Sequence, residues 1–206
     1  MWISFYNKEG IGDTLLLSSG IANRYEVVTT TKGTVTQICH EKTGEVIGYN
    51  LASISETLSL TAQGHVQLTV EEQQLVKKVI TEAGFDGETL DLTVKPTLVV
   101  GYVETCVPHE DSDHLSVTQT RVSDTEVLQI VCGAPNVKAG QKVVVATPGT
   151  VMPNGAVIWA GELRGVASHG MLCSARELGI EQETQKKGIL VLDDAIAVGT
   201  PFNEVK

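Results

Sequence analysis

Short runs of β-branched and apolar residues, each ended by a turn signal, most strongly constrain the fold of this 206-residue chain. In the second half, five such runs predict strands at residues 97–107, 115–122, 127–132, 143–146 and 157–163. Five short strands with irregular connections fit a small β-barrel of the oligonucleotide-binding (OB) type better than a sandwich. Ser174 and Glu177 then form a capping-box pattern, which predicts a short helix that Gly179 would end.

The first half has the pattern of a small α+β unit. Strands are predicted at residues 1–5, 14–17, 25–31, 34–40 and 46–51, with turn signals between the last three. Thr69 and Glu72 form a capping box, and apolar residues then recur at helical spacing. These are Leu75, Val76, Val79, Ile80 and Ala83. Breakers from Asp86 to Pro96 predict two domains. The expected fold class is α+β, with an α+β domain at residues 1–92 and an OB-fold five-stranded β-barrel at residues 93–206.

Charge is distributed unevenly along the chain. The formal net charge is -10, yet residues 127–176 hold four cations against one anion, Glu162, which is a balance of +3. The four cations are Lys138, Lys142, Arg164 and Arg176. A confined basic surface can hold one particular anionic partner, while the acidic remainder repels others. The sequence therefore predicts no general affinity for nucleic acid, DNA included.

A glycine-punctuated string at residues 163–174 lies inside this basic stretch. Gly165 and Gly170 allow a tight backbone turn that exposes N–H groups, and Ser168 can offer its hydroxyl to a phosphate or base edge. The alternative is an ordinary glycine-rich turn packed by its own apolar residues. Catalysis by Ser168 is disfavoured, because Val166 stands where a nucleophile elbow needs glycine.

Two further segments leave alternatives open. Residues 133–142 fit an ordinary exposed loop as well as a binding loop. Residues 109–114 fit a solvated acidic loop better than a metal site, because the glycine and final glutamate of a calcium loop are missing. The four cysteines form no Cys-x-x-Cys pair, so no metal or cofactor is expected, and scattered thiols fit a reducing cytoplasm.

Aromatic residues are scarce in the second half. It holds only Tyr102, Trp159 and Phe202, which cannot form a long stacking platform for single-stranded bases. If this half binds RNA, a folded RNA recognised through its shape and backbone is the better expectation.

The segment from about Leu98 to Leu192 resembles the tRNA-binding domain of the bacterial phenylalanyl-tRNA synthetase β chain and of free-standing tRNA-binding proteins. Its string Ser168-His169-Gly170-Met171-Leu172 matches the family's Ser-any-Gly-Met-Leu signature. With its extra N-terminal α+β domain, the chain is similar to the YtpR family. The resemblance implies an OB fold, tRNA binding without catalysis, no cofactor and a homodimer.

The resemblance also places Ser168 and Met171 on the RNA-facing side, with Arg164 and Asn136 as neighbours. Together with the other cations and signature residues, the predicted RNA-binding site comprises Ser168, Met171, Arg164, Gly170, His169, Asn136, Lys138, Lys142, Arg176 and His114. Relatives often carry a base where His114 stands and an acid where Ala167 stands. The basic face is thus expected to be small and its RNA affinity to fall quickly with salt.

Two other functions remain open at this point. One is a protein-interaction or dimerisation module that kept the OB barrel and lost RNA binding, which the acidic balance favours. The other is an enzyme that hydrolyses misacylated tRNA. No apolar run approaches the roughly 20 residues that span a bilayer, so no membrane contact and a cytoplasmic location are expected.

Overall fold

The computed structural model describes residues 1–180 and 187–205, and it divides into two compact units. Unit 1 is Met1–Lys95 and unit 2 is Pro96–Lys206. The chain is mostly β with a small helical content, so the expected α+β class is confirmed only in part. The reason is that a single helix of more than four residues, α2, is found in the described part of the chain.

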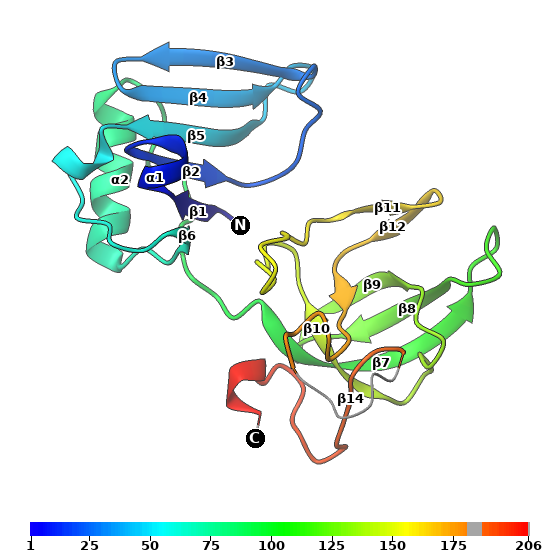
Figure 1. Ribbon diagram of the computed structural model, residues 1–206. Coiled ribbons are helices and arrows are strands. Elements are labelled where there is room, and N and C mark those ends of the chain that lie inside the picture. The colour runs from blue at the N-terminus through cyan, green and yellow to red at the C-terminus, as the bar shows by residue number, and fades with distance from the viewer. Residues whose placement is uncertain (181–186, 206) are drawn as a thin grey trace. The chain divides into compact units, whose positions relative to one another are not determined.

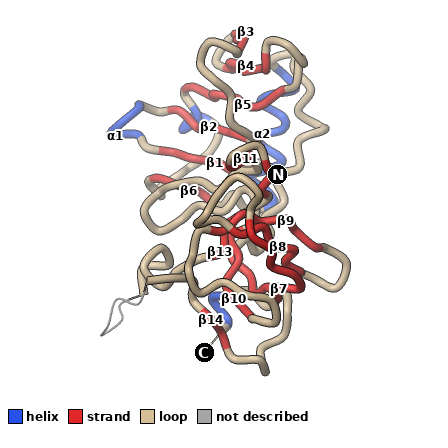
Figure 2. Tube along the Cα trace, turned by 90° about the vertical axis from the view of Figure 1, so that its right-hand side faces the viewer, coloured by secondary structure: helices blue, strands red, loops and turns tan. Residues whose placement is uncertain are grey.

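Unit 1 is a six-stranded antiparallel sheet in the order β3-β4-β5-β2-β1-β6, which can be followed from top to bottom in Figure 2. The strands are β1 Ile3–Tyr6, β2 Thr14–Ser18, β3 Val27–Lys32, β4 Val35–His40, β5 Val46–Ala52 and β6 Gly64–Val66. Glycine and Lys-Thr-Gly turns separate β3, β4 and β5, as the sequence predicts. The three-residue strand β6 and the four-residue helix α1 (Lys8–Ile11) were not predicted.

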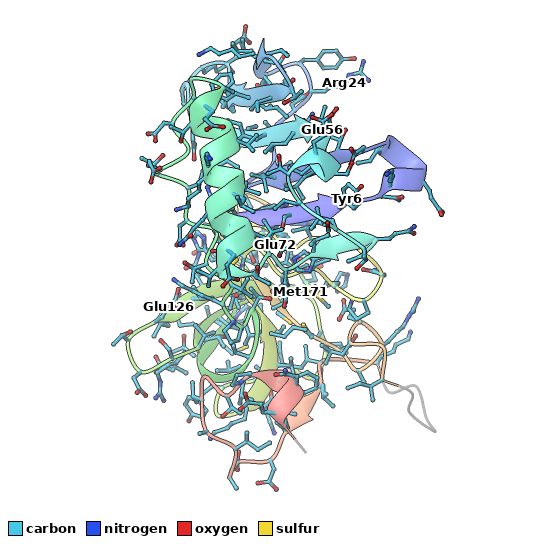
Figure 3. All side chains as sticks on the ribbon, turned by 90° about the vertical axis from the view of Figure 1, so that its left-hand side faces the viewer. Tyr6, Arg24, Glu56, Glu72, Glu126 and Met171 are labelled. Atoms are coloured by element: carbon cyan, nitrogen blue, oxygen red, sulfur yellow. The ribbon has the colours of Figure 1, made fainter. Side chains whose placement is uncertain are left out.

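Helix α2 (Val70–Glu82) covers one face of this sheet, and Figure 3 labels Glu72 in its first turn. Both halves of the predicted capping box are present, between Thr69 and Glu72. Val76 and Ile80 are fully buried in the core with Tyr49 and Leu51. Leu75, in contrast, is 39% exposed, so its predicted place on the core face is wrong. None of the helices in the described ranges has the length and apolar character needed to cross a membrane.

Asp13 ties the start of β2 to β1 and to the 3₁₀ turn at Ile54–Glu56. Its carboxylate accepts hydrogen bonds from the Ser55 hydroxyl at 2.6 Å and from the Tyr6 hydroxyl at 2.9 Å. The Ser55 backbone N–H donates to the same group at 3.2 Å. The bond from the Ser55 hydroxyl is the main cause that holds the pKa of Asp13 below its ordinary value of 3.8.

Replacing Asp13 by asparagine is expected to reduce the acid sensitivity of unit 1. Because the folded pKa of Asp13 lies below its unfolded value, the carboxylate contributes stability that is complete above the unfolded pKa and is lost as pH falls through the folded pKa. Urea unfolding at about pH 7 and about pH 3, followed through Trp2 in a Trp159→Phe background, measures this loss. The wild type should lose more stability than Asp13→Asn, and equal losses would contradict the role given to Asp13.

Unit 2 is built on a sheet in the order β13-β10-β7-β8-β9, with β14 also paired to β10. Figure 1 labels β7, β8, β9, β10 and β14 of this sheet. The strands are β7 Leu98–Pro108, β8 Ser116–Arg121, β9 Val127–Cys132, β10 Lys142–Ala146, β13 Met171–Leu172 and β14 Val191–Leu192. Side chains alternate along β10, so Val143 and Val145 face one apolar cluster while Val144 and Ala146 face another. The sheet is OB-like, but its paired strands do not close into a barrel.

Two predicted elements of unit 2 are wrong. Of the fifth strand predicted at residues 157–163, only β11 (Gly161–Leu163) is a strand, and it pairs with β12 (Val166–Ser168) in a separate hairpin instead of joining the sheet. The predicted helix after Ser174 is a single turn, although the capping bonds between Ser174 and Glu177 are present. The positive φ of Gly179, +71°, ends the turn before a second one forms, and one turn does not offset the cost of helix nucleation.

Candidate nucleic-acid interface

The family-like string forms a kinked segment, residues 166–172, that bonds to two different strands. Its first part follows the edge of β9, where the His169 N–H donates to the Gln129 carbonyl at 2.8 Å. Its second part is β13, where Met171 pairs with Ala146 of β10. Gly170, with φ of +139°, makes the bend between the two parts. The segment therefore links strands at opposite ends of the β10-β7-β8-β9 path.

The Ser168 hydroxyl holds this bend from inside. Ser168 is 4% exposed, and its Oγ accepts a hydrogen bond from the Val131 N–H at 3.1 Å. The same hydroxyl donates to the Gly170 carbonyl at 3.3 Å. From the sequence we expected this hydroxyl to bond to a phosphate or base edge, whereas in the structure it bonds to backbone groups of the protein. The difference arises because sequence does not show which way a side chain in a tight turn will point.

The β11–β12 hairpin turns at Arg164 and Gly165. Their φ values of +49° and +77° are both positive, as a two-residue type I′ turn requires. The Arg164 side chain is exposed, and its Nη1 donates to the carbonyl of Asp111 at 3.0 Å. This bond ties the tip of the hairpin to the loop at residues 109–114.

A buried histidine makes a second bond between the same loop and hairpin. His109 is 4% exposed, and its Nδ1 accepts a hydrogen bond from the Asp111 N–H at 3.0 Å. Its Nε2 must then be the protonated nitrogen, and it donates to the Leu163 carbonyl at 3.2 Å. The loop and the hairpin thus form one ridge, and the loop also carries the exposed His114.

The outer face of β8 and β9 adjoins this ridge. Thr118, Thr120 and Ile130 are fully buried on the inner side, so the alternating residues Gln119 and Gln129 lie outside. The Gln119 Nε2 donates to Gln129 Oε1 at 3.0 Å, and Gln129 Nε2 donates to the carbonyl at position 167 at 2.8 Å. The face is therefore polar, and hydrogen bonds connect it to the kinked segment.

Arg121 supplies a cation on this same face. Its Nε donates to Glu104 Oε1 at 2.8 Å, and its guanidinium lies 5.5 Å from the ring centroid of Tyr102. Sequence reasoning missed Arg121, Gln119 and Gln129. The available signal was the alternation of these polar residues with inward residues along two correctly predicted strands, but the charge count began at residue 127.

The four cations of the basic stretch lie on four different elements. Arg164 is on the ridge, whereas Lys142 begins β10, and its Nζ donates to the Ile196 carbonyl. Lys142 stands four positions from Ala146, the partner of Met171, or about 13 Å along the strand. Lys138 is exposed on the loop before β10, and Arg176 is exposed on the turn after β13. The structure thus does not gather them around the kinked segment.

Asn136 has a structural contact that its sequence context does not show. Its Nδ2 donates to the Ile189 carbonyl at 3.0 Å, and its Oδ1 accepts from the Ile189 N–H at 2.9 Å. The side chain thus binds a backbone as a neighbouring strand would. A surface pocket of about 400 Å³ lies beside it and is lined by Met171, Cys132 and Glu177, among others. Met171 is half-buried at this pocket.

The described residues contain no activated nucleophile at these positions. The Ser168 hydroxyl is bonded to backbone groups, and His169 bonds to β9 through its backbone N–H. Burial raises the pKa of the Cys132 thiol, and it raises that of Cys173 to about 12, so both stay protonated at neutral pH. In the described ranges, no group of three His, Cys, Asp or Glu side chains is placed to hold a metal ion. The fold and this polar face define an OB-like binding module.

Comparisons with known proteins agree with this class. Residues 98–201 match the family described as "Putative tRNA binding domain", and residues 22–92 match a domain of unknown function (DUF4479). The chain is 45% identical, over 97% of its length and 98% of the relative's, to "Putative tRNA-binding protein YtpR" of Bacillus subtilis (strain 168). The chain therefore belongs to the YtpR family.

Two further matches are partial. The chain is 46% identical, over 66% of its length, to the phenylalanine–tRNA ligase β subunit of Oceanobacillus iheyensis, of which it covers 17%. A crystal structure of a MetRS-related protein from Pyrococcus horikoshii matches 50% of this chain and 85% of that one, at 21% identity and a TM-score of 0.38.

Proposed function

We propose that this protein binds tRNA without catalysing a reaction on it, and that it does so in the cytoplasm. The observation that carries the proposal is the match of residues 98–201 to a tRNA-binding family, on a unit with a polar face and no activated nucleophile among its described residues. The Bacillus subtilis relative, which is similar over 97% of this chain, is itself named as a putative tRNA-binding protein. Free thiols at all four cysteines fit a reducing compartment.

We assign the fold of residues 93–206 as a five-stranded, partly open OB barrel, with residues 1–92 as a separate domain. The kinked segment at residues 166–172 supports this assignment, because it bonds to β9 on one side and to β10 on the other. It thereby acts as the fifth strand in place of the predicted run at residues 157–163. OB barrels bind nucleic acid on the face of their second and third strands, between two loops.

That rule points to the outer face of β8 and β9 as the RNA-binding surface. The loop at residues 109–114 and the β11–β12 hairpin flank this face, and bonds from His109 and Arg164 hold them together. Among the predicted residues, Arg164, His114, His169 and Met171 contact RNA in this proposal. Ser168, Gly170 and Asn136 position the backbone, and Arg121, Gln119 and Gln129 join the contact surface.

The face has few free positive charges, since Arg121 is paired with Glu104 and the adjoining loop contains Glu110, Asp111 and Asp113. Recognition must therefore depend on the shape and hydroxyl groups of a folded RNA more than on charge. Neutralising two or three phosphates gives a salt slope of about -2 in a plot of log affinity against log salt concentration.

Titration of fluorescently labelled tRNA with the full-length protein tests the function and its location. Binding at about 50 mM salt is expected to weaken about tenfold in Arg164→Ala, with the salt slope reduced by about 1. Lys138→Ala removes the same charge outside the proposed face and should bind within about twofold of wild type. Failure of the wild type to bind at low salt would contradict the function. Equal losses in the two variants would contradict the face.

A protein-interaction module is the second candidate, and the acids beside Arg121 and Arg164 are the observation that favours it. A stoichiometric protein that co-purifies with the chain in the absence of RNA, together with no tRNA binding at low salt, would establish it over the first.

A further inference from the structure

The pocket of about 400 Å³ beside Asn136 lies where the kinked segment leaves β9. The segment is bonded to β9 at His169, and after the bend at Gly170 it pairs with β10 as β13. Val131 on the edge of β9 and Leu172 of β13 both line the space that opens between the two strands. Its volume falls in the range of about 300–1,000 Å³ found for sites that bind small molecules. The pocket is therefore the open seam of this OB-like sheet.

The two strand edges at this seam carry backbone groups that can bind a ligand. The Val131 N–H donates to the Ser168 hydroxyl at 3.1 Å, so the carbonyl of the same residue also points away from β8. The Cys173 N–H donates to the Val144 carbonyl, so the neighbouring Leu172 points its N–H away from β10. Within residues 1–180 and 187–205, nothing bonds to the Val131 carbonyl or to the Leu172 N–H. The seam thus has one acceptor and one donor on its strand edges.

Glu177 adds a second acceptor to the pocket. Its Oε2 accepts the capping bonds from the Ser174 N–H at 2.8 Å and from the Ser174 hydroxyl at 2.6 Å. Its Oε1 has no such bond to any described residue. Because the carboxylate is rigid, the capping box that holds Oε2 also fixes Oε1. Glu177 is the one charged residue in the described lining, so the pocket disfavours a phosphate group.

The other walls are apolar, and one of them is anchored. Asn136 bonds to the Ile189 carbonyl at 3.0 Å and to the Ile189 N–H at 2.9 Å, which fixes the wall at residues 188–189. Pro135, Met171 and Ile189 supply apolar surface. A space with apolar walls and a few fixed polar groups suits a flat base that has its polar atoms along one edge.

We propose that this pocket binds the base of an unpaired guanosine in the RNA. Guanine carries two adjacent donors, the N1 and N2 hydrogens, beside one acceptor, O6, along its pairing edge. The pocket offers the complementary set, with acceptors at Glu177 and Val131 and a donor at Leu172. Adenine, cytosine and uracil each have a single donor group on that edge, so they would leave one acceptor of the pocket without a partner.

The inference rests on the proposed function for the source of the guanosine. The pocket adjoins the proposed RNA-binding face, because a methyl group on Gly133 in its lining would lie 3.3 Å from Cδ2 of Leu115, which follows the loop at residues 109–114. A free guanine nucleotide offers the same base. Its phosphate would find no cation in the described lining, so RNA is the source that the pocket favours.

Titration of the full-length, ¹⁵N-labelled protein with single nucleosides tests the pocket in the absence of RNA. Guanosine at about 1 mM should shift amide signals in residues 131–134 and 171–177, and adenosine, cytidine and uridine should bind about tenfold more weakly. No shift, or equal shifts with all four, would overturn the proposal. Guanosine monophosphate that binds more than about tenfold tighter than guanosine would overturn RNA as the source.

Glu177→Gln tests the role of the carboxylate. Glutamine also serves in a capping box, but its amide group would replace the acceptor Oε1 by a donor. Affinity for guanosine and for tRNA should each fall about tenfold, with unchanged thermal stability. Glu72→Gln makes the same substitution in the capping box of α2 and should leave both affinities within about twofold of wild type. Equal behaviour of the two variants would contradict the assigned acceptor.

Kethoxal, which modifies N1 and N2 of unpaired guanines, tests the site in the tRNA complex. At saturating protein, wild type and Glu72→Gln should protect a guanine that Glu177→Gln leaves reactive. If tRNA binds and no guanine is protected, the pocket proposal is overturned and the proposed function stands. If tRNA does not bind at all, the proposed function fails, and guanosine binding in the titration would then identify a nucleotide as the ligand.

Discussion

Gly170→Ala is expected to destabilise unit 2 by about 3–5 kcal/mol and to abolish tRNA binding with it. Only glycine adopts the φ of +139° without strain. A methyl group at this position would also lie 2.7 Å from the carbonyl oxygen of Ala146, the last residue of β10, which pairs with Met171 of β13. Either the bend or that pairing must open, and both hold the kinked segment in place.

Gly165→Ala is the matched control for this prediction. Gly165 also has a positive φ, +77°, but nothing lies within 4 Å of an added methyl group. The expected cost is the left-handed strain alone, about 1–2 kcal/mol. Urea unfolding followed through Trp159 in a Trp2→Phe background measures both variants. Equal losses in the two would mean that contact with Ala146 contributes nothing.

Ser168→Ala is expected to cost about 1–3 kcal/mol of unit 2 stability, because it leaves the buried Val131 N–H without its acceptor. The role proposed for this hydroxyl is to position the bend, so the fraction that remains folded should bind tRNA within about twofold of wild type with an unchanged salt slope. A residue that touched RNA would give the reverse pattern, with weaker binding and little change in stability.

Ser123→Ala serves as the control for loss of a hydroxyl. The Ser123 Oγ accepts a bond from the Thr125 N–H at 3.3 Å in an exposed turn, so its removal should change stability by no more than about 0.5 kcal/mol. If Ser168→Ala changed stability as little as Ser123→Ala and yet weakened tRNA binding tenfold, the Ser168 hydroxyl would contact RNA and would not hold the bend from inside the protein.

The strands that sequence predicted well are those whose pattern is local. The strands β8, β9 and β10 alternate side chains between two faces, and turn residues bound each of them. Helix α2 could be predicted equally well from the sequence, because its capping box of four residues fixes where the helix starts. In each case the residues that decide the structure are neighbours in the chain.

The kinked segment could not be predicted because its conformation depends on distant partners. Its bonds run to Gln129 on one side and to Ala146 on the other, across more than twenty residues of sequence. No pattern within residues 166–172 states that the chain leaves one strand and joins another. The resemblance located this string, but only the structure shows that Ser168 holds the bend while Arg164 reaches across to another loop.

The basic face was predicted by counting charges along the chain. Because such a count ignores the fold, the prediction was only partly useful. Cations that are near in sequence, such as Lys142 and Arg164, lie on different elements and are held by different carbonyls. Arg121 lies outside residues 127–176, where the charges were counted, yet it is on the outer face of β8 and β9. In a β protein, the register between neighbouring strands decides which charged side chains lie together on one face.

Hydrogen exchange of the full-length protein, measured with and without saturating tRNA, tests the proposed face most directly. We expect slower exchange at residues 109–121 and 161–171 when tRNA is bound, with no change at residues 138–142 or in unit 1. Protection confined to residues 138–142 or to unit 1, or no protection at all under conditions where tRNA is bound, would contradict it.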